Sequence, residues 1–127
     1  MANAFKNAGV ALSTTNATTL YQVPTGVNSS VVHSIYIANV DGSNSVNVNV
    51  EVSTDGAGSA NFFHVAKTVP VPADASLILD KPINLFNTST ASAGDLIRVT
   101  ASAASDLECL LAYWRLLTNV LYWKNNQ

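Results

Sequence analysis

Residues 29–54, SSVVHSIYIANVDGSNSVNVNVEVST, contain the clearest strand pattern of the chain. Valine occupies every even position from 46 to 52, with Asn, Asn and Glu between the valines. Because successive side chains of a strand point to opposite faces, this spacing predicts a strand with one buried side and one hydrated side. A second apolar stretch precedes it, and Asp41-Gly42 lies between the two stretches. The pattern predicts a β-hairpin with a loop of about five residues. The residues expected to face the core are Val46, Val48, Val50 and Val52, and those expected outside are Asn47, Asn49 and Glu51.

Length and charge restrict the class of protein. The chain has 127 residues, the size of one domain with a substantial core. Only 11% of its residues are charged, and Asn, Ser and Thr supply most of the polarity, which favours an all-β domain with long turns. A net charge of −2 without a basic cluster gives no electrostatic basis for binding nucleic acid or an anionic membrane. So low a charge protects poorly against self-association, and we expect a protein that assembles.

Short apolar stretches separated by turn residues continue along the chain. Besides the hairpin, strands are expected at residues 5–12, 18–23, 61–69, 75–79, 96–101 and 107–114. Residues 83–86 either continue the strand before them or cross to the other sheet, and the glycine-rich residues 55–59 are expected to connect a hairpin. About eight antiparallel strands predict a single β-sandwich of immunoglobulin-like or jelly-roll type. The sandwich domain is expected to span residues 1–114, followed by a tail at 115–127.

Aromatic and aliphatic residues gather around the start of this tail. The predicted interface residues are Tyr113, Trp114, Leu117, Val120, Leu121, Tyr122 and Trp123. Trp and Tyr dominate association energies, and their aliphatic neighbours favour an interface over a sugar-stacking platform. Three of the apolar residues recur at the i, i+3, i+4 spacing of one short amphipathic helix. We expect the tail to act as a docking arm on a neighbouring subunit. The alternative is that it folds back over an open face of its own sandwich.

Side chains that carry chemistry are sparse. His33 and His64 lie on different predicted strands and lack a third ligand at zinc spacing. The aspartates lie in or beside turns, where Asp caps the backbone. Glu51 and Glu108 are the only strand carboxylates, and both are expected on the hydrated face. We therefore expect no catalytic residue, no metal site, no cofactor and no enzymatic activity.

The cysteine content and the first residues bear on the cellular compartment. Cys109 is the single cysteine, so an internal disulfide is excluded. It alternates with Leu107 and Leu111, which predicts a buried apolar thiol rather than a reactive nucleophile. The first residues lack the apolar run of a secretion signal, and residues 107–123 are too interrupted by polar and charged residues for a membrane span. A soluble protein made in the cytoplasm is expected.

Four stretches of the chain follow one order of strands and turns. They are TLYQVPTG at 19–26, VHSIYIAN at 32–39, PADASLIL at 72–79 and AGDLIRVTAS at 93–102. Over residues 18–114 this order resembles small β-sandwich virion proteins of tailed bacteriophages. That group includes capsid decoration (cement) proteins and some neck and tail components. The residues after 114 depart from the pattern, so the location within the virion stays open.

The resemblance implies a structural role without catalysis. Its leading form is a capsid decoration or cement subunit that stabilises the head shell of the virion and is made in the host cytoplasm. The implied partners are further copies of the chain, with a trimer at symmetry axes favoured, and the major capsid protein or other virion proteins. Two alternatives stay open. One is a neck, tail or fibre-associated virion component, and the other is a carbohydrate-binding module for host-surface recognition.

Overall fold

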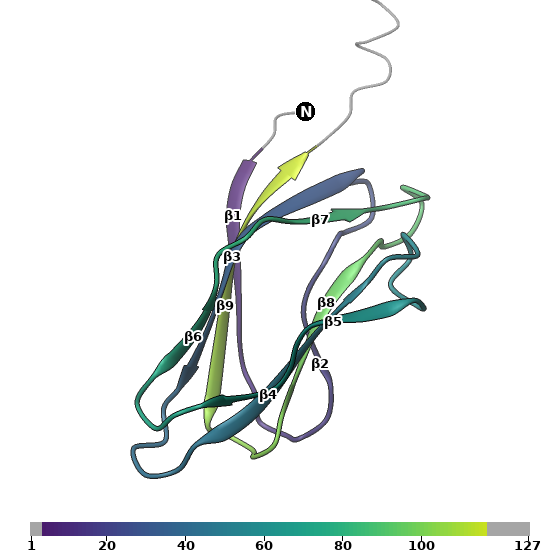
Figure 1. Ribbon diagram of the computed structural model, residues 1–127. Coiled ribbons are helices and arrows are strands. Elements are labelled where there is room, and N and C mark those ends of the chain that lie inside the picture. Colours follow the sequence, from purple (N-terminus) through teal and green to yellow (C-terminus); the bar gives the residue numbers. More distant parts are fainter. Residues whose placement is uncertain (1–3, 117–127) are drawn as a thin grey trace, which may run out of the picture.

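The computed structural model describes residues 4–116 as two antiparallel β-sheets packed face to face, which confirms the predicted β-sandwich (Figure 1). The strands are β1 (Ala4–Ala11), β2 (Thr18–Gln22), β3 (Ser29–Asn39), β4 (Val46–Ser53), β5 (Phe62–Val71), β6 (Ser76–Leu79), β7 (Ile83–Phe86), β8 (Leu96–Ala101) and β9 (Leu107–Leu116). Within these residues, no helix is long and apolar enough to cross a membrane.

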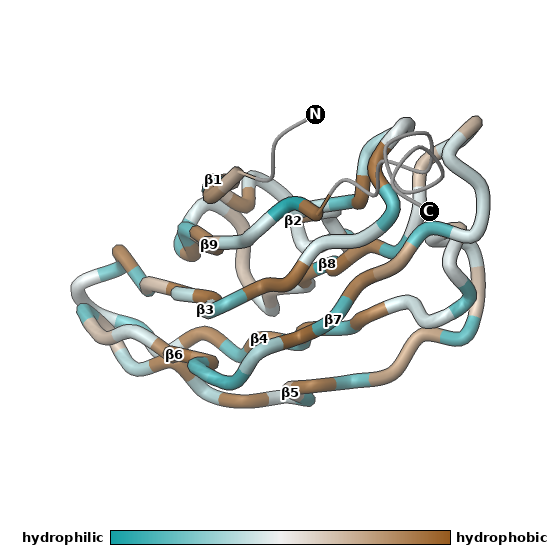
Figure 2. Tube along the Cα trace, turned by 90° about the horizontal axis from the view of Figure 1, so that it is seen from above, coloured by the Kyte–Doolittle hydropathy of each residue, from teal (hydrophilic) through white to brown (hydrophobic). Residues whose placement is uncertain are grey.

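The order of the strands selects one of the two predicted topologies. One sheet, here called the β3 sheet, has the order β1-β9-β3-β6, with β7 also paired to β3. The other, the β4 sheet, has the order β2-β8-β4-β5. Among the described strands, only the β4–β5 and β6–β7 connections stay within one sheet, and every other connection crosses between the sheets. This alternation is the jelly-roll arrangement rather than the immunoglobulin-like one. Figure 2 shows the two layers from above.

The hairpin predicted at residues 29–54 is wrong, because β3 and β4 belong to different sheets. The residues between them instead carry the chain across the sandwich. Asn39 holds this crossing by donating from Nδ2 to the carbonyl oxygens of Asn44 at 2.8 Å and Val71 at 2.9 Å. Asp41 accepts from the backbone N–H of Ser43 at 2.8 Å. The turn residues therefore reverse the chain as expected, but they do not determine which sheet the next strand joins.

The core lies between the two sheets, and the predicted register of β4 is confirmed. Val46, Val48, Val50 and Val52 are all buried, whereas Asn47 is exposed and the two residues that follow on its side are half-buried. The facing layer comes from the inner residues of the β3 sheet. The largest of these with almost no exposed surface are Val32, Ile35, Ile37, Leu85, Leu107 and Leu111.

A buried carboxylate joins the two sheets at one end of the sandwich. Asp95 Oδ1 accepts from the backbone N–H of Gly56 at 2.7 Å and from Ser53 Oγ at 3.1 Å, both on the β4 side. Its Oδ2 accepts from the N–H of Phe86 on β7 at 3.2 Å. Gly56 has a φ of 76°, and a Cβ there would overlap the side chains of Thr88 and Phe86. The glycine-rich loop is thus the β4–β5 hairpin connection that the sequence predicts.

The last strand is longer than predicted. Arg115 and Leu116 continue β9 and pair with Ser30 and Ser29 of β3, so the strand passes the expected boundary at residue 114 by two residues. Residues 1–3 and 117–127 lie outside the described part of the chain. The tail helix, the docking arm and the interface residues Leu117, Val120, Leu121, Tyr122 and Trp123 fall in the second of these segments and stay predictions.

Candidate functional site

A row of exposed apolar side chains crosses the outer face of the β3 sheet. Backbone pairing aligns Gly9 of β1 with Leu110 of β9. Leu110 is aligned in turn with Tyr36 of β3, and Tyr36 with Ile78 of β6. Leu110, Tyr36 and Ile78 are exposed to 47%, 42% and 54%. Because directly paired residues point to the same side of a sheet, Leu110, Tyr36 and Ile78 form one apolar row across β9, β3 and β6, and Gly9 extends it to β1 without a side chain.

The positions around this row are mostly uncharged, and the whole set is called the apolar face below. Besides the row, it consists of Phe5, Asn7 and Ala11 on β1; Glu108, Ala112 and Trp114 on β9; Val31, His33, Ser34 and Ala38 on β3; and Ser76, Asn84 and Phe86 on β6 and β7. Among these described positions, Glu108 is the one acidic side chain, and no Lys or Arg is present. A sheet face with so little charge is suited to contact with protein rather than with water.

An aromatic cluster lies at the end of the apolar face where β1 begins and β9 ends. The ring of Phe5 stacks on Trp114 with centroids 5.6 Å apart and an interplanar angle of 17°. Phe5 also stacks on His33 at 5.9 Å, which requires it to reach across β9 toward β3. Phe5 itself is 77% exposed. The predicted interface residue Trp114 therefore does lie on an outer face, partly covered by Phe5.

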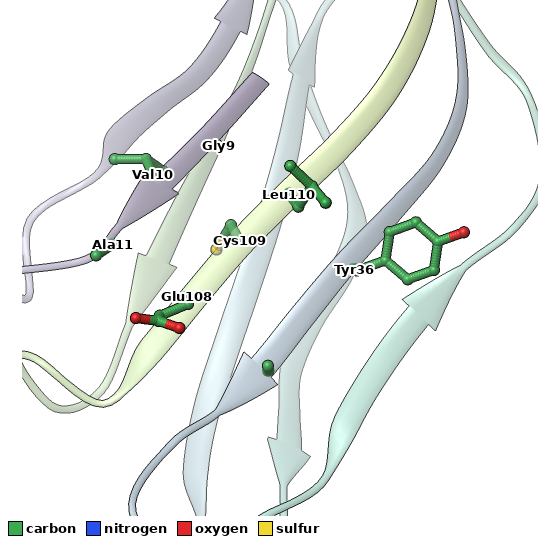
Figure 3. A pocket seen from close by; sticks show the side chains of 8 residues that line it. Gly9, Val10, Ala11, Tyr36, Glu108, Cys109 and Leu110 are labelled. Carbon is green, nitrogen blue, oxygen red and sulfur yellow. The ribbon is translucent and has the colours of Figure 1, made fainter. Parts of the chain in front are cut away.

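An open depression of about 470 Å³ lies beside the apolar row. Figure 3 shows it, with Leu110 and Tyr36 on neighbouring strands and Glu108 further along β9. Gly9, Ala11 and Ala38 line it without bulky side chains, so the surface is low at this point. Small-molecule sites combine an apolar lining with several converging polar groups. Among the lining residues, only Glu108 and Tyr36 carry a carboxyl or hydroxyl group, and Figure 3 shows the Tyr36 hydroxyl pointing away from Glu108. Such a lining is better suited to an apolar side chain of a protein partner.

The outer face of the β4 sheet has the opposite character. Arg98 donates from Nε and from the second terminal nitrogen to the two carboxylate oxygens of Glu51, each at 3.2 Å. The guanidinium carbon of Arg98 also lies 3.6 Å from the centre of the Phe62 ring. His64 Nε2 is 3.8 Å from Glu51. The hydrogen bonds from Arg98 hold the pKa of Glu51 below its ordinary value. Glu51 and Arg98 are therefore paired with each other on this face, and Glu51 lies on the hydrated side as expected.

Tyr113 was expected at the interface, but it belongs to the core. It is 8% exposed, and its ring centre lies 4.1 Å from that of Tyr21. Neighbouring residues of a strand point to opposite faces, so the adjacent pair Tyr113-Trp114 cannot share one surface. Burial raises the pKa of Tyr21 to about 12, despite a 2.6 Å hydrogen bond with the Ser30 hydroxyl. Both tyrosines thus serve the packing of the sandwich.

The cysteine and the histidines occupy separate environments. Cys109 is 3% exposed, and burial raises the pKa of its thiol to about 12, which confirms the predicted buried apolar thiol. His33 lies on the outer face of the β3 sheet, and His64 lies on the outer face of the β4 sheet beside Glu51. The whole sandwich separates the two imidazoles, so they do not meet at one metal ion within a chain. Residues 4–116 contain no group of three or more His, Cys, Asp and Glu arranged to hold a metal.

Sequence reasoning missed most of the apolar face, although one signal was present. Phe5, Tyr36, Ile78 and Leu110 were not singled out. The signal is that residues 107–114 are largely apolar at both parities, whereas residues 46–52 alternate cleanly. A strand that is apolar on both sides is typical of one that is covered on both sides.

Comparison with known proteins shows the fold alone. No protein-family model and no curated protein matches the chain. Among solved structures, the chain is similar to a subunit of Bacillus endospore appendages, described as disulfide-linked pili, with 14% identity over 91% of this chain and 89% of that one and a TM-score of 0.51. A capsid structure of Helicobacter pylori bacteriophage KHP30 has 14% identity over 93% and 90%, with a TM-score of 0.47. A capsid structure of cyanophage Pam1 has 18% identity over 91% and 85%, with a TM-score of 0.48. At such low identities the function has to be argued from the surface of the molecule.

Proposed function

We propose that the chain is a structural subunit of a bacteriophage virion that binds other protein subunits through its apolar face. The observation that carries this proposal is the contrast between a nearly uncharged outer face on the β3 sheet and a charge-paired outer face on the β4 sheet. Four strands about 4.8 Å apart and about 20 Å long give the apolar face an area of about 400 Å². The largest apolar patch on a typical monomeric protein has about this size and is often functional.

Within that role, a capsid decoration or cement subunit fits best. A subunit that assembles on a shell needs one face for contact with its neighbours and another for solvent, and the two sheets divide in this way. The resemblance of residues 18–114 to small virion proteins supports the same assignment. The jelly roll adds support, because viral capsid domains use this architecture, although lectin domains use it as well.

We further propose that the subunit forms homo-oligomers, with a trimer at symmetry axes of the shell, and that the major capsid protein is its other partner. A standard specific interface buries about 800 Å² on each partner, roughly twice the area of the apolar face. Contacts beyond this face are therefore needed for a stable complex, and oligomers at symmetry axes supply them by repetition.

Immunogold electron microscopy tests the virion role. Antibodies raised against the purified chain are applied to virus particles from a culture of the source organism, with pre-immune serum as the control. Label spread evenly over the heads is the expected result. Label confined to the neck, tail or fibres would replace the decoration role with the alternative virion location. Particles without label, in a culture that produces the protein, would overturn the proposal.

A carbohydrate-binding module is the second candidate, because an exposed aromatic pair is a common sugar platform. Phe5 is the most exposed aromatic ring near Trp114 and favours this reading. Glycan arrays probed with the unaltered protein and with Trp114→Ala and Trp123→Ala variants separate the two functions. We expect no saturable binding. Saturable binding that either substitution removes would favour the sugar-binding function.

A further inference from the structure

We propose that the apolar face is the receptor for residues 117–127 of a neighbouring copy of the chain. This inference rests on the proposed function, since both require that the chain assembles, and it deepens that function by naming the segment that makes the contact. It is argued from the area of the face, the composition of the segment and the place where the segment leaves β9.

The area of the face points to a short segment rather than to a second face. Two apolar faces pressed together would bury about 400 Å² on each partner, half of what a specific interface usually needs. The eleven residues that follow β9 include Tyr122 and Trp123. Each aromatic residue buries about 150–250 Å² when fully covered. If the copies in an oligomer exchange these segments, each copy contributes both a face and a segment, and the shared area reaches the usual range.

The composition of the segment matches the face that would receive it. Its apolar residues are Leu117, Val120, Leu121, Tyr122 and Trp123. Lys124 is its one charged side chain, and Glu108 is the one acidic side chain among the described positions of the face. Fully extended, eleven residues span about 36 Å, more than the length of about 20 Å along the face. The segment is therefore long enough to cross the face of a neighbour after leaving its own sheet.

The end of β9 favours a neighbouring copy over the same copy. Leu116 is still paired with Ser29, so the strand runs in the plane of the sheet up to the last described residue. To cover its own outer face, the chain would have to reverse out of that plane directly afterwards. Residues 115–118, RLLT, include none of the residues Gly, Pro, Asn, Asp and Ser that most readily form such a reversal, and Asn119 is the first of these to follow.

Cross-linking between two differently marked chains tests the proposal. Both chains carry Cys109→Ala, which removes the native thiol. The receptor chain ends at Leu116 and carries Tyr36→Cys on the apolar face. The donor chain keeps residues 117–127 and carries Leu121→Cys. The two are mixed with a short bismaleimide, at a concentration where sedimentation shows the full-length protein to be associated. Ile78→Cys serves as a second receptor position, and Asn47→Cys on the outer face of the β4 sheet serves as the matched control.

We expect a cross-linked heterodimer of receptor and donor when the receptor carries Tyr36→Cys or Ile78→Cys. We expect no heterodimer when it carries Asn47→Cys. Melting temperatures of all variants establish that each chain is folded. Linkage within one chain that carries both Tyr36→Cys and Leu121→Cys, without any heterodimer, would show that the segment covers its own copy. Linkage of the truncated receptor to itself would show a second face as the occupant. Either result would overturn the inference, as would a full-length protein that is monomeric at every concentration.

This experiment uses purified protein and no virus particle. A positive cross-link together with unlabelled particles in microscopy would retain the inference and reject the virion role. Labelled heads without any cross-link would retain the virion role and reject the inference about residues 117–127. The two proposals can therefore fail separately.

Discussion

The two outer faces of the sandwich come from strands with different sequence patterns. On β4, valines fill the inner side and Asn47, Asn49 and Glu51 fill the outer side. On β9, the inner side has Cys109 and Leu111, while the outer side has Leu110 and Trp114, so both sides are largely apolar. Strict alternation leaves a strand that needs one covering layer, whereas apolar residues on both sides require two. The structure supplies one layer for β9, and we propose that a partner supplies the other.

The faces also differ in how their polar groups are satisfied. On the β4 sheet, Arg98 contacts both Glu51 and the Phe62 ring, so these groups satisfy one another. On the β3 sheet, the exposed groups are mostly hydrocarbon. Burying them against a partner is favourable by a free energy of about 25 cal/mol for each Å² of apolar surface. The first face contributes to folding, and the second is available for assembly.

The largest expected loss of stability comes from a charge placed on the inner side of the β4 sheet, and the same charge on the outer side should have little effect. Val50 is fully buried, so Val50→Asp places an unpaired carboxylate in the core at a cost of several kcal/mol, about 3 or more. We expect this variant to be unfolded at room temperature by far-ultraviolet circular dichroism.

The matched control is the neighbouring residue on the outer side. Asn49 Oδ1 accepts from the N–H of Thr68 at 2.6 Å, and a carboxylate oxygen at that place accepts the same bond. Asn49→Asp should therefore change the free energy of unfolding by no more than about 0.5 kcal/mol in urea titrations. Equal losses in the two variants would reject the assigned register of β4.

The next largest change in stability is expected from the Glu51–Arg98 pair on the outer face of the β4 sheet. Glu51→Gln removes the carboxylate that accepts both bonds from Arg98, and we expect a loss of about 1 kcal/mol in the free energy of unfolding at pH 7. Association should be unchanged, because this face is not the proposed contact. A variant that lost oligomerisation but kept its stability would reverse the roles of the two faces.

The same substitution predicts a pH dependence. The pKa of Glu51 is lower in the folded chain than its ordinary value of 4.5, mainly because Arg98 donates hydrogen bonds to the ionised form. Its contribution to stability is therefore complete above about pH 5 and is lost as the pH falls through the folded-state pKa. We expect the stability difference between the wild type and Glu51→Gln to shrink as the pH is lowered below 4.5, measured by urea titration at each pH.

The smallest expected change in stability concerns β5, the edge strand of the β4 sheet. Thr68 on β5 has a φ of 52°, an unfavourable value for a β-branched residue, at a place where the β4–β5 register shifts. Asn tolerates this conformation better, so Thr68→Asn should raise the free energy of unfolding by about 0.5 kcal/mol. Thr100→Asn, in the regular part of β8, is the control and should lower it slightly. A decrease at both positions would show that the strain at Thr68 is negligible.

Local patterns were enough to predict the strands, the sandwich and much of its core. Alternating valines set the register of β4, and the alternation around Cys109 predicted its burial correctly. These predictions depend only on the two-residue period of a strand, which local sequence contains. The length of β9 was underestimated by two residues, since Arg115 gave no reason to continue the strand.

Pairing between strands could not be predicted in the same way. The turn at Asp41-Gly42 reverses the chain whether the next strand joins the same sheet or the opposite one, so the predicted hairpin was wrong. The apolar row depends on alignments between β1, β9, β3 and β6, and these strands are far apart in sequence. Tyr113 and Trp114 were grouped because they are adjacent, although adjacency in a strand places them on opposite faces.

Sedimentation velocity over a wide range of protein concentration tests the central claim most directly, that the apolar face is an association surface. The wild type is compared with Leu110→Lys, in the middle of the apolar row, and with Asn47→Lys on the polar face. Leu110 is 47% exposed, so its replacement should leave the melting temperature nearly unchanged. We predict concentration-dependent oligomers for the wild type and Asn47→Lys and a monomer for Leu110→Lys. Identical sedimentation of the wild type and a folded Leu110→Lys variant at every concentration would contradict the claim.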